Sequence, residues 1–259
     1  MDFFEKIDTK PTGDFEWNVP EQKLGHVAVV GGSKQNFRTE IKVSEFLSKQ
    51  YPIKIVQVVL PDALEKSLPS LPNFIFLRST ESGSFADGKE LEKTFEASDF
   101  NLLIGDLSKN SITSKAMTDA CSSAKKPLLI TRDAIDLVIE NHPERLLMNE
   151  QIIFLASMPQ LQKIFRAVYY PKMLLLSQSL IQVADALHKF TLSYPISVIT
   201  LQGGQVLIAK SGTVKSIPLE RTGYSPLMFW GGEIAAKIAA LNLYNPSNFI
   251  NASVSAIWK

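Results

Sequence analysis

The amino-acid sequence predicts an α/β protein with three layers (α/β/α), in which a mainly parallel central sheet is flanked by helices on both faces. Two observations lead to this prediction. Short, continuously apolar runs of strand length alternate along the chain with longer segments of helical periodicity. Strands that are apolar on both faces are typical of parallel sheets buried beneath helices, and parallel strands need a long, usually helical connection.

The expected strands are apolar runs bounded by turn residues, at positions 26–31, 53–60, 73–77, 101–105, 127–131, 152–156 and 196–201. Helical patterns lie between or after most of them, near 38–49, 89–96, 111–124, 134–148, 158–166 and 172–190. A late hairpin is expected to join 206–209 to 214–217, and two helices, about 232–244 and 247–257, complete the pattern. Residues 1–22 have the composition of a lead-in arm. No repeat, low-complexity run or linker interrupts the sequence, so we predict one domain over residues 1–259.

The composition narrows the classes of partner. The 259 residues include 27 Lys and Arg against 26 Asp and Glu, a formal net charge of +1. This balance argues against nucleic acid or an anionic membrane as the main partner. The single cysteine, Cys121, excludes an internal disulfide framework and a multi-cysteine metal site, and we predict no protein-built metal site. The first residues lack the basic and apolar regions of a signal peptide, so we expect a cytoplasmic protein.

Ligands of open α/β sheets bind outside the carboxyl ends of the strands, so the residues directly after each strand are the candidate site. Glycine and polar residues gather there, in the segments 31–33, 105–106, 131–133, 202–204 and 231–233. Neither of the two common phosphate-binding glycine motifs is present.

The segment Gly231-Gly232-Glu233 opens a long apolar helix. A glycine turn that leads into a helix exposes unpaired N–H groups at the positive end of the helix dipole, which attracts phosphate oxygens. A carboxylate beside it could act as the base for a bound hydroxyl. The alternative is a plain loop that leads into a buried helix, with Glu233 favoured there by the dipole alone.

Six partial motifs occur in one order along the chain: KLGHV and VVGGS at 23–33, IG at 104–105, LLITRDAI at 128–135, a helix–strand–helix pattern at 135–165, TLQG with VLI at 200–208, and GEIAA at 232–236. In this order and spacing the chain resembles the ribokinase-like superfamily, and within it the ADP- or ATP-dependent NAD(P)H-hydrate dehydratases. The resemblance spans about residues 16–259.

The resemblance implies a divergent carbon–oxygen lyase that repairs damaged nicotinamide cofactors. Members use Mg²⁺ with ADP or ATP to phosphorylate the hydroxyl group of hydrated NAD(P)H, after which phosphate leaves. The implied ligands are therefore a nucleotide and hydrated NAD(P)H, and the implied assembly is a homo-oligomer, as a tetramer.

The resemblance also assigns roles to residues of this chain. Glu233 takes the place of the catalytic Asp. The nucleotide and phosphate positions are Gly231, Gly232, Gln202 and Gly203. The substrate positions are Gly32, Ser33, Phe37, Gly105 and Asp133.

Three departures from the family motifs leave two other functions open. Gln202 replaces a lysine, Trp230 replaces the first glycine before the catalytic position, and Asp106 follows Gly105 where the family continues with proline and glycine. A noncatalytic ribokinase-like protein that serves as a binding or assembly module fits these losses. A small-molecule kinase of the same superfamily is the other alternative.

Several site residues also have a structural interpretation. Asp133 could be the N-cap of the helix that follows it. Phe37 could cover the core, Gln202 could close a turn, and Trp230 could pack inward or at a subunit interface. Glu233 could be a helix-start residue only.

Overall fold

The computed structural model describes residues 2–8, 19–69 and 71–258, and its ten strands form one sheet with the order β1-β10-β9-β8-β7-β6-β5-β2-β3-β4. The strands are β1 (Phe4–Lys6), β2 (Leu24–Gly31), β3 (Ile53–Pro61), β4 (Phe74–Leu77), β5 (Phe100–Gly105), β6 (Leu128–Thr131), β7 (Ile152–Leu155), β8 (Ser197–Gln202), β9 (Gln205–Lys210) and β10 (Thr213–Pro218). Neighbouring strands from β4 to β8 are parallel. Strands β8, β9 and β10 are antiparallel, and β1 adds parallel to β10.

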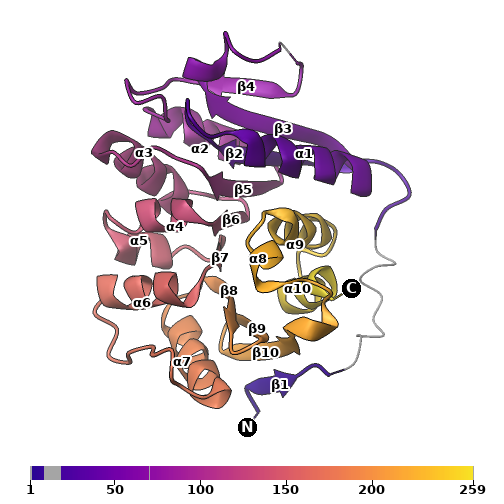
Figure 1. Ribbon diagram of the computed structural model, residues 1–259, viewed down its shortest axis with the longest axis vertical. Coiled ribbons are helices and arrows are strands. Elements are labelled where there is room, and N and C mark those ends of the chain that lie inside the picture. The colour runs from indigo at the N-terminus through magenta and orange to yellow at the C-terminus, as the bar shows by residue number, and fades with distance from the viewer. Residues whose placement is uncertain (1, 9–18, 70, 259) are drawn as a thin grey trace.

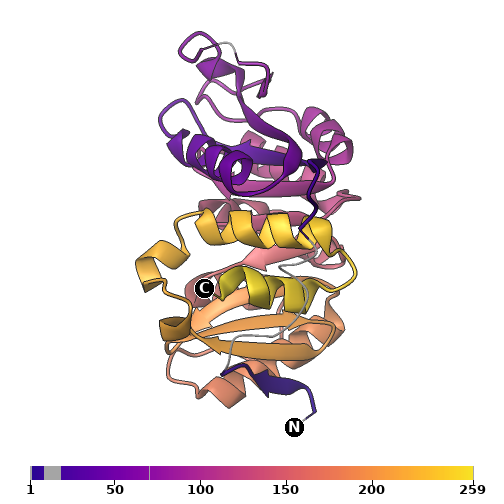
Figure 2. The ribbon, with the colours of Figure 1, turned by 90° about the vertical axis from the view of Figure 1, so that its right-hand side faces the viewer.

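Helices cover both faces of this sheet. They are α1 (Arg38–Gln50), α2 (Gly88–Ala97), α3 (Ser111–Ser122), α4 (Asp133–Val138), α5 (Pro143–Leu147), α6 (Met158–Ala167), α7 (Leu180–Ser193), α8 (Pro226–Phe229), α9 (Glu233–Tyr244) and α10 (Phe249–Ile257). Helices α2 to α7 lie on one face, and α1, α9 and α10 lie on the other (Figure 1). Figure 2 looks onto this second face. Over the described ranges, no helix combines the length and apolar character needed to cross a membrane.

Two apolar layers hold the sheet between the helices. Within the fully buried strand β5, Leu102 and Ile104 belong to the layer beneath α1, α9 and α10, whereas Leu103 belongs to the layer beneath α2 to α7. Successive side chains of a strand point to opposite faces, so a continuous apolar run serves both layers. The predicted three-layer architecture is confirmed.

The helix expected over 134–148 is wrong in extent, because the structure divides it into α4 and α5. His142 has a left-handed backbone with φ of 46°, and Pro143 is the first residue of α5. Proline has no N–H to donate to the preceding turn, so it begins helices more readily than it continues them.

Three other details differ from the sequence predictions. The helix expected over 172–190 begins only at Leu180, where Ser179 and Gln182 form a capping box. The arm predicted over 1–22 contains the short strand β1, and residues 9–18 of that prediction lie outside the described residues. The one-turn helix α8, directly before Trp230, was not predicted.

Candidate functional site

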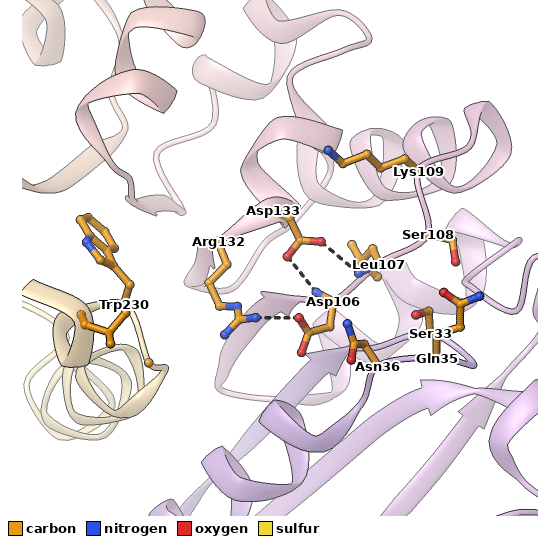
Figure 3. A pocket seen from close by; sticks show the side chains of 12 residues that line it. Ser33, Gln35, Asn36, Asp106, Leu107, Ser108, Lys109, Arg132, Asp133 and Trp230 are labelled. Carbon is orange, nitrogen blue, oxygen red and sulfur yellow. Dashed lines mark hydrogen bonds and ion pairs between the residues drawn. The ribbon is translucent and has the colours of Figure 1, made fainter.

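The ends of β2, β5 and β6 form one rim of a pocket at the carboxyl edge of the sheet, where open α/β folds bind ligands. Its volume is about 960 Å³. Among the described residues, its lining consists of Ser33, Gln35, Asn36, Asp106, Leu107, Ser108, Lys109, Arg132, Asp133, Leu227, Trp230 and Gly231. We call this the carboxyl-edge pocket. Figure 3 shows Trp230 on one side, the 33–36 loop on the other, and Arg132 and Asp106 between them.

An ion pair forms the middle of the pocket. Arg132 Nη2 lies 2.6 Å from Asp106 Oδ1, and Thr39 Oγ1 donates to Asp106 Oδ2 at 2.7 Å. Both Asp106 and Arg132 have positive φ, 56° and 57°. Such backbone conformations are costly for residues with side chains and cluster at functional sites. The two charges are therefore held in place by the backbone as well as by each other.

Asp133 fixes the loop that follows β5. Its Oδ1 accepts the N–H of Asp106 at 2.9 Å, and its Oδ2 accepts the N–H of Leu107 at 3.2 Å. The N-cap interpretation of Asp133 is wrong, because the N-cap of α4 is Arg132 and no side chain caps that helix. A Cβ atom on Gly105 would overlap Asp133 Oδ1, so glycine is needed at that position.

Glu40 is a pocket neighbour that was not predicted from the sequence. Its side chain is fully buried in the first turn of α1, and neither carboxyl oxygen has a hydrogen-bond partner on another residue. Burial raises the pKa of Glu40 from 4.5 to about 8. Helical spacing could have revealed it, because Glu40 shares the i, i+3, i+4, i+7 positions with the buried Val43, Ser44 and Leu47.

Glu233 begins α9 as predicted, but its carboxylate is engaged outside the pocket lining. Tyr224 donates its hydroxyl proton to Glu233 Oε1 at 2.9 Å, and Lys237 Nζ lies 3.5 Å from the same oxygen. Lys237 also donates to the Tyr224 hydroxyl. The side chain of Glu233 is 42% exposed. Tyr224 and Lys237 therefore hold the Glu233 carboxylate outside the pocket lining.

The two glycines before Glu233 lie differently. Gly231 lines the pocket, whereas Gly232 is the N-cap of α9 with φ of 95°. A Cβ on Gly232 would come within 2.8 Å of Val43 Cγ2, so this glycine permits the close approach of α1 to α9. Trp230 lines the pocket and packs edge-on against Phe229, with 4.9 Å between ring centroids.

The remaining predicted positions separate into two groups. Ser33 lines the pocket, and the N–H of Gly32 donates to the carbonyl of Gly105 at 2.7 Å, so these residues lie together at the ends of β2 and β5. Phe37 packs on the small apolar cluster around Leu60 and is not among the lining residues described above.

Gln202 is the last residue of β8, and Gly203 begins the turn to β9; both are likewise outside that lining. The Gln202 side-chain amide donates to the carbonyl of Leu176 at 3.0 Å.

The residues at the start of α9 do not fit the Mg²⁺–nucleotide that the resemblance implies. The Glu233 carboxylate accepts a hydrogen bond from Tyr224, and the Gln202 amide donates to Leu176. Trp230, which stands where the resemblance places a phosphate-contacting glycine, lines the pocket. No group of three or more His, Cys, Asp or Glu side chains in the described part of the chain could hold a metal ion.

No protein-family model and no curated protein sequence matches this chain. Solved structures do. A ribokinase-like superfamily protein from Enterococcus faecalis has a TM-score of 0.65 at 16% identity, over 98% of this chain and 86% of that one. The ADP/ATP-dependent NAD(P)H-hydrate dehydratase from Bacillus subtilis, co-crystallised with ATP/Mg²⁺, has a TM-score of 0.59 at 14% identity, over 94% and 83%.

A kinase is also among the neighbours. Hydroxyethylthiazole kinase from Pyrococcus horikoshii has a TM-score of 0.57 at 11% identity, over 93% of this chain and 79% of that one. Neighbours with different activities share the fold, and fold alone does not assign activity. What the neighbours have in common is the architecture, and this chain has the ribokinase-like fold.

Proposed function

We propose that this protein binds an anionic nicotinamide dinucleotide, such as NADH or hydrated NADH, in the carboxyl-edge pocket, and that Glu233 does not act as a base there. One observation carries the proposal: Arg132 and Lys109 line the pocket, whereas the Glu233 carboxylate accepts a hydrogen bond from Tyr224 outside the lining. A general base must lie within hydrogen-bond reach of the proton that it takes.

The lining suits the parts of such a ligand. Trp230 and Leu227 offer an apolar wall for a heterocyclic ring. Arg132 and Lys109 offer N–H donors for a diphosphate, while Asp106 and Asp133 balance their charge in the lining. The polar 33–36 loop offers side-chain amides and a hydroxyl for sugar hydroxyls or a carboxamide. The volume of about 960 Å³ is within the range of small-molecule sites.

The nicotinamide class is supported by two likenesses. The partial motifs resemble those of NAD(P)H-hydrate dehydratases, and one structural neighbour is such an enzyme. We therefore infer a protein that keeps the ligand class of these enzymes without their chemistry, in agreement with the noncatalytic alternative.

The dehydratase reaction is the second candidate, and the retained carboxylate favours it. Glu233 stands at the start of α9, where the resemblance places the catalytic Asp, and its side chain is 42% exposed. To act as a base it would have to leave Tyr224 and turn toward Gly231.

One pair of measurements tests both candidates. NADH is titrated by fluorescence, and the protein is then incubated with hydrated NADH, Mg²⁺ and ADP or ATP while NADH absorbance is followed. We expect NADH to bind without any recovery of NADH from the hydrate. Glu233→Gln should leave the affinity unchanged, whereas Arg132→Ala should weaken it by about 10-fold or more, because a charge-assisted hydrogen bond contributes about 1.5–3 kcal/mol.

Lys125→Ala is the matched control, because Lys125 pairs with Glu96 at the surface and is 73% exposed. Circular dichroism and thermal melting check that each variant is folded. Recovery of NADH by the wild type, reduced at least about 100-fold in Glu233→Gln, would establish the dehydratase instead. Absence of NADH binding would refute the proposal.

A further inference from the structure

Glu40 is the least satisfied polar side chain at this end of the sheet. It is fully buried, and both of its oxygens lack hydrogen-bond partners on other residues. A Cβ atom on Gly31, the last residue of β2, would contact Glu40 Oε1, so the carboxyl group lies directly against the strand end. Buried side-chain oxygens are nearly always hydrogen-bonded, and exceptions of this kind often mark a functional position.

The surroundings of Glu40 are charged. Asp106, Arg132 and Asp133 are the ionisable groups that act on its carboxyl group, and all three line the carboxyl-edge pocket. Thr39, the preceding residue, donates to Asp106 at 2.7 Å. The Nε of Arg132 is also buried without a partner. Glu40 is therefore part of the charge arrangement of the pocket, although it does not line it.

The protonation of Glu40 decides the net charge of that arrangement. The ionisable lining residues are Lys109, Arg132, Asp106 and Asp133, two cations and two anions, so they balance while Glu40 is neutral. Loss of its proton to solvent leaves one uncompensated negative charge in a region of low dielectric, where electrostatic repulsion is strong.

We propose that Glu40 determines the charge specificity of the pocket: an anionic ligand binds while the Glu40 carboxyl group carries its proton and is repelled once that group is ionised. This inference rests on the proposed function, because it requires an anion in the pocket. The electrostatic setting agrees with it. Burial raises the pKa of Glu40 and outweighs the lowering by its own backbone N–H and by Arg132, while Asp106 and Asp133 add to the rise, so Glu40 keeps its proton at neutral pH.

The test is the pH dependence of NADH binding between pH 6.5 and 9.5, a range over which the diphosphate of NADH keeps its charge. If only the protonated form binds, the wild-type Kd should be nearly constant at low pH and should rise by up to about tenfold per pH unit above pH 8. Glu40→Gln keeps the size and the neutral charge, so its Kd should remain constant over the whole range.

Glu45→Gln is the matched control, because Glu45 is on the same helix but is exposed and pairs with Lys49. It should retain the pH dependence of the wild type. A wild-type measurement makes the test independent of any variant. Calorimetric titration near pH 8.5 in two buffers of different ionisation enthalpy should show proton uptake when NADH binds.

The outcomes separate the two ideas. NADH binding with the same pH dependence in wild type and Glu40→Gln, or without proton uptake, overturns the role of Glu40 and leaves the proposed function intact. Absence of NADH binding at every pH overturns both.

Discussion

Replacement of Glu40 by glutamine should make the protein more stable, and the gain should grow with pH. The pKa of Glu40 is about 8 in the folded protein against an ordinary 4.5. Between these values the folded state holds the proton and the unfolded state has released it. The unfolding free energy of the wild type therefore falls as pH rises through this window and levels off above pH 8.

The size of this effect follows from the two pKa values. Each pKa unit corresponds to about 1.4 kcal/mol, so raising the pKa from 4.5 to about 8 lowers the wild-type stability by up to about 5 kcal/mol at pH 8. Glutamine cannot ionise, so Glu40→Gln removes this pH-dependent loss of unfolding free energy. We expect the difference between Glu40→Gln and wild type to widen steadily from pH 5 to pH 8.

Urea unfolding at pH 5, 6.5 and 8, followed by tryptophan fluorescence, measures this difference. Glu45→Gln, at an exposed position of the same helix, should run parallel to the wild type. If the unfolding free energies of Glu40→Gln and wild type stay parallel over the three pH values, Glu40 is not held protonated by burial. The charge of the pocket would then not depend on a proton held by Glu40.

Three further predictions test other parts of the structure. Gly232→Ala should lower the unfolding free energy by about 2–4 kcal/mol, because φ is 95° and the new Cβ would meet Val43. The control Gly203→Ala, which has positive φ but open space around it, should lower it by about 1 kcal/mol. Equal losses in urea unfolding would contradict the packing role of Gly232. Asp133→Asn should lower it by about 1–3 kcal/mol because two charge-assisted backbone hydrogen bonds weaken, and an unchanged denaturation midpoint would argue against them. Trp230→Ala should weaken NADH binding by about 2- to 12-fold if the ring stacks there, and an unchanged fluorescence titration would place the ring elsewhere.

The sheet could be predicted from the sequence because its strands are local, continuous apolar runs. The expected strand at 101–105 matches β5, which is buried along its whole length. The short strand β1 could not be predicted in the same way, because its three residues are held by pairing with β10 at the far end of the chain. Pro143 marks the break between α4 and α5 in the sequence. The helical periodicity of the apolar residues led to one predicted helix over 134–148 in spite of this proline.

The candidate site was harder to predict than the fold. Ser33 and Asp133 could be placed near each other because the ends of parallel strands meet at one edge. Gly231 lines the same pocket but follows α8, which was not predicted. The direction of the Glu233 side chain depends on Tyr224 and Lys237, and no local pattern reveals that contact. The single domain, the homo-oligomer and the cytoplasmic location stay predictions.

The position of β1 has a consequence for how the sheet is completed. Strand β1 precedes the other described strands in sequence, yet it pairs with β10, which follows all of them, so their contact joins distant segments of the chain. Contacts between such distant segments form late and slow folding. Until then the backbone of β10 is an open edge that could pair with another chain. Pairing of β1 with β10 therefore protects the β10 edge against intermolecular strand pairing and aggregation.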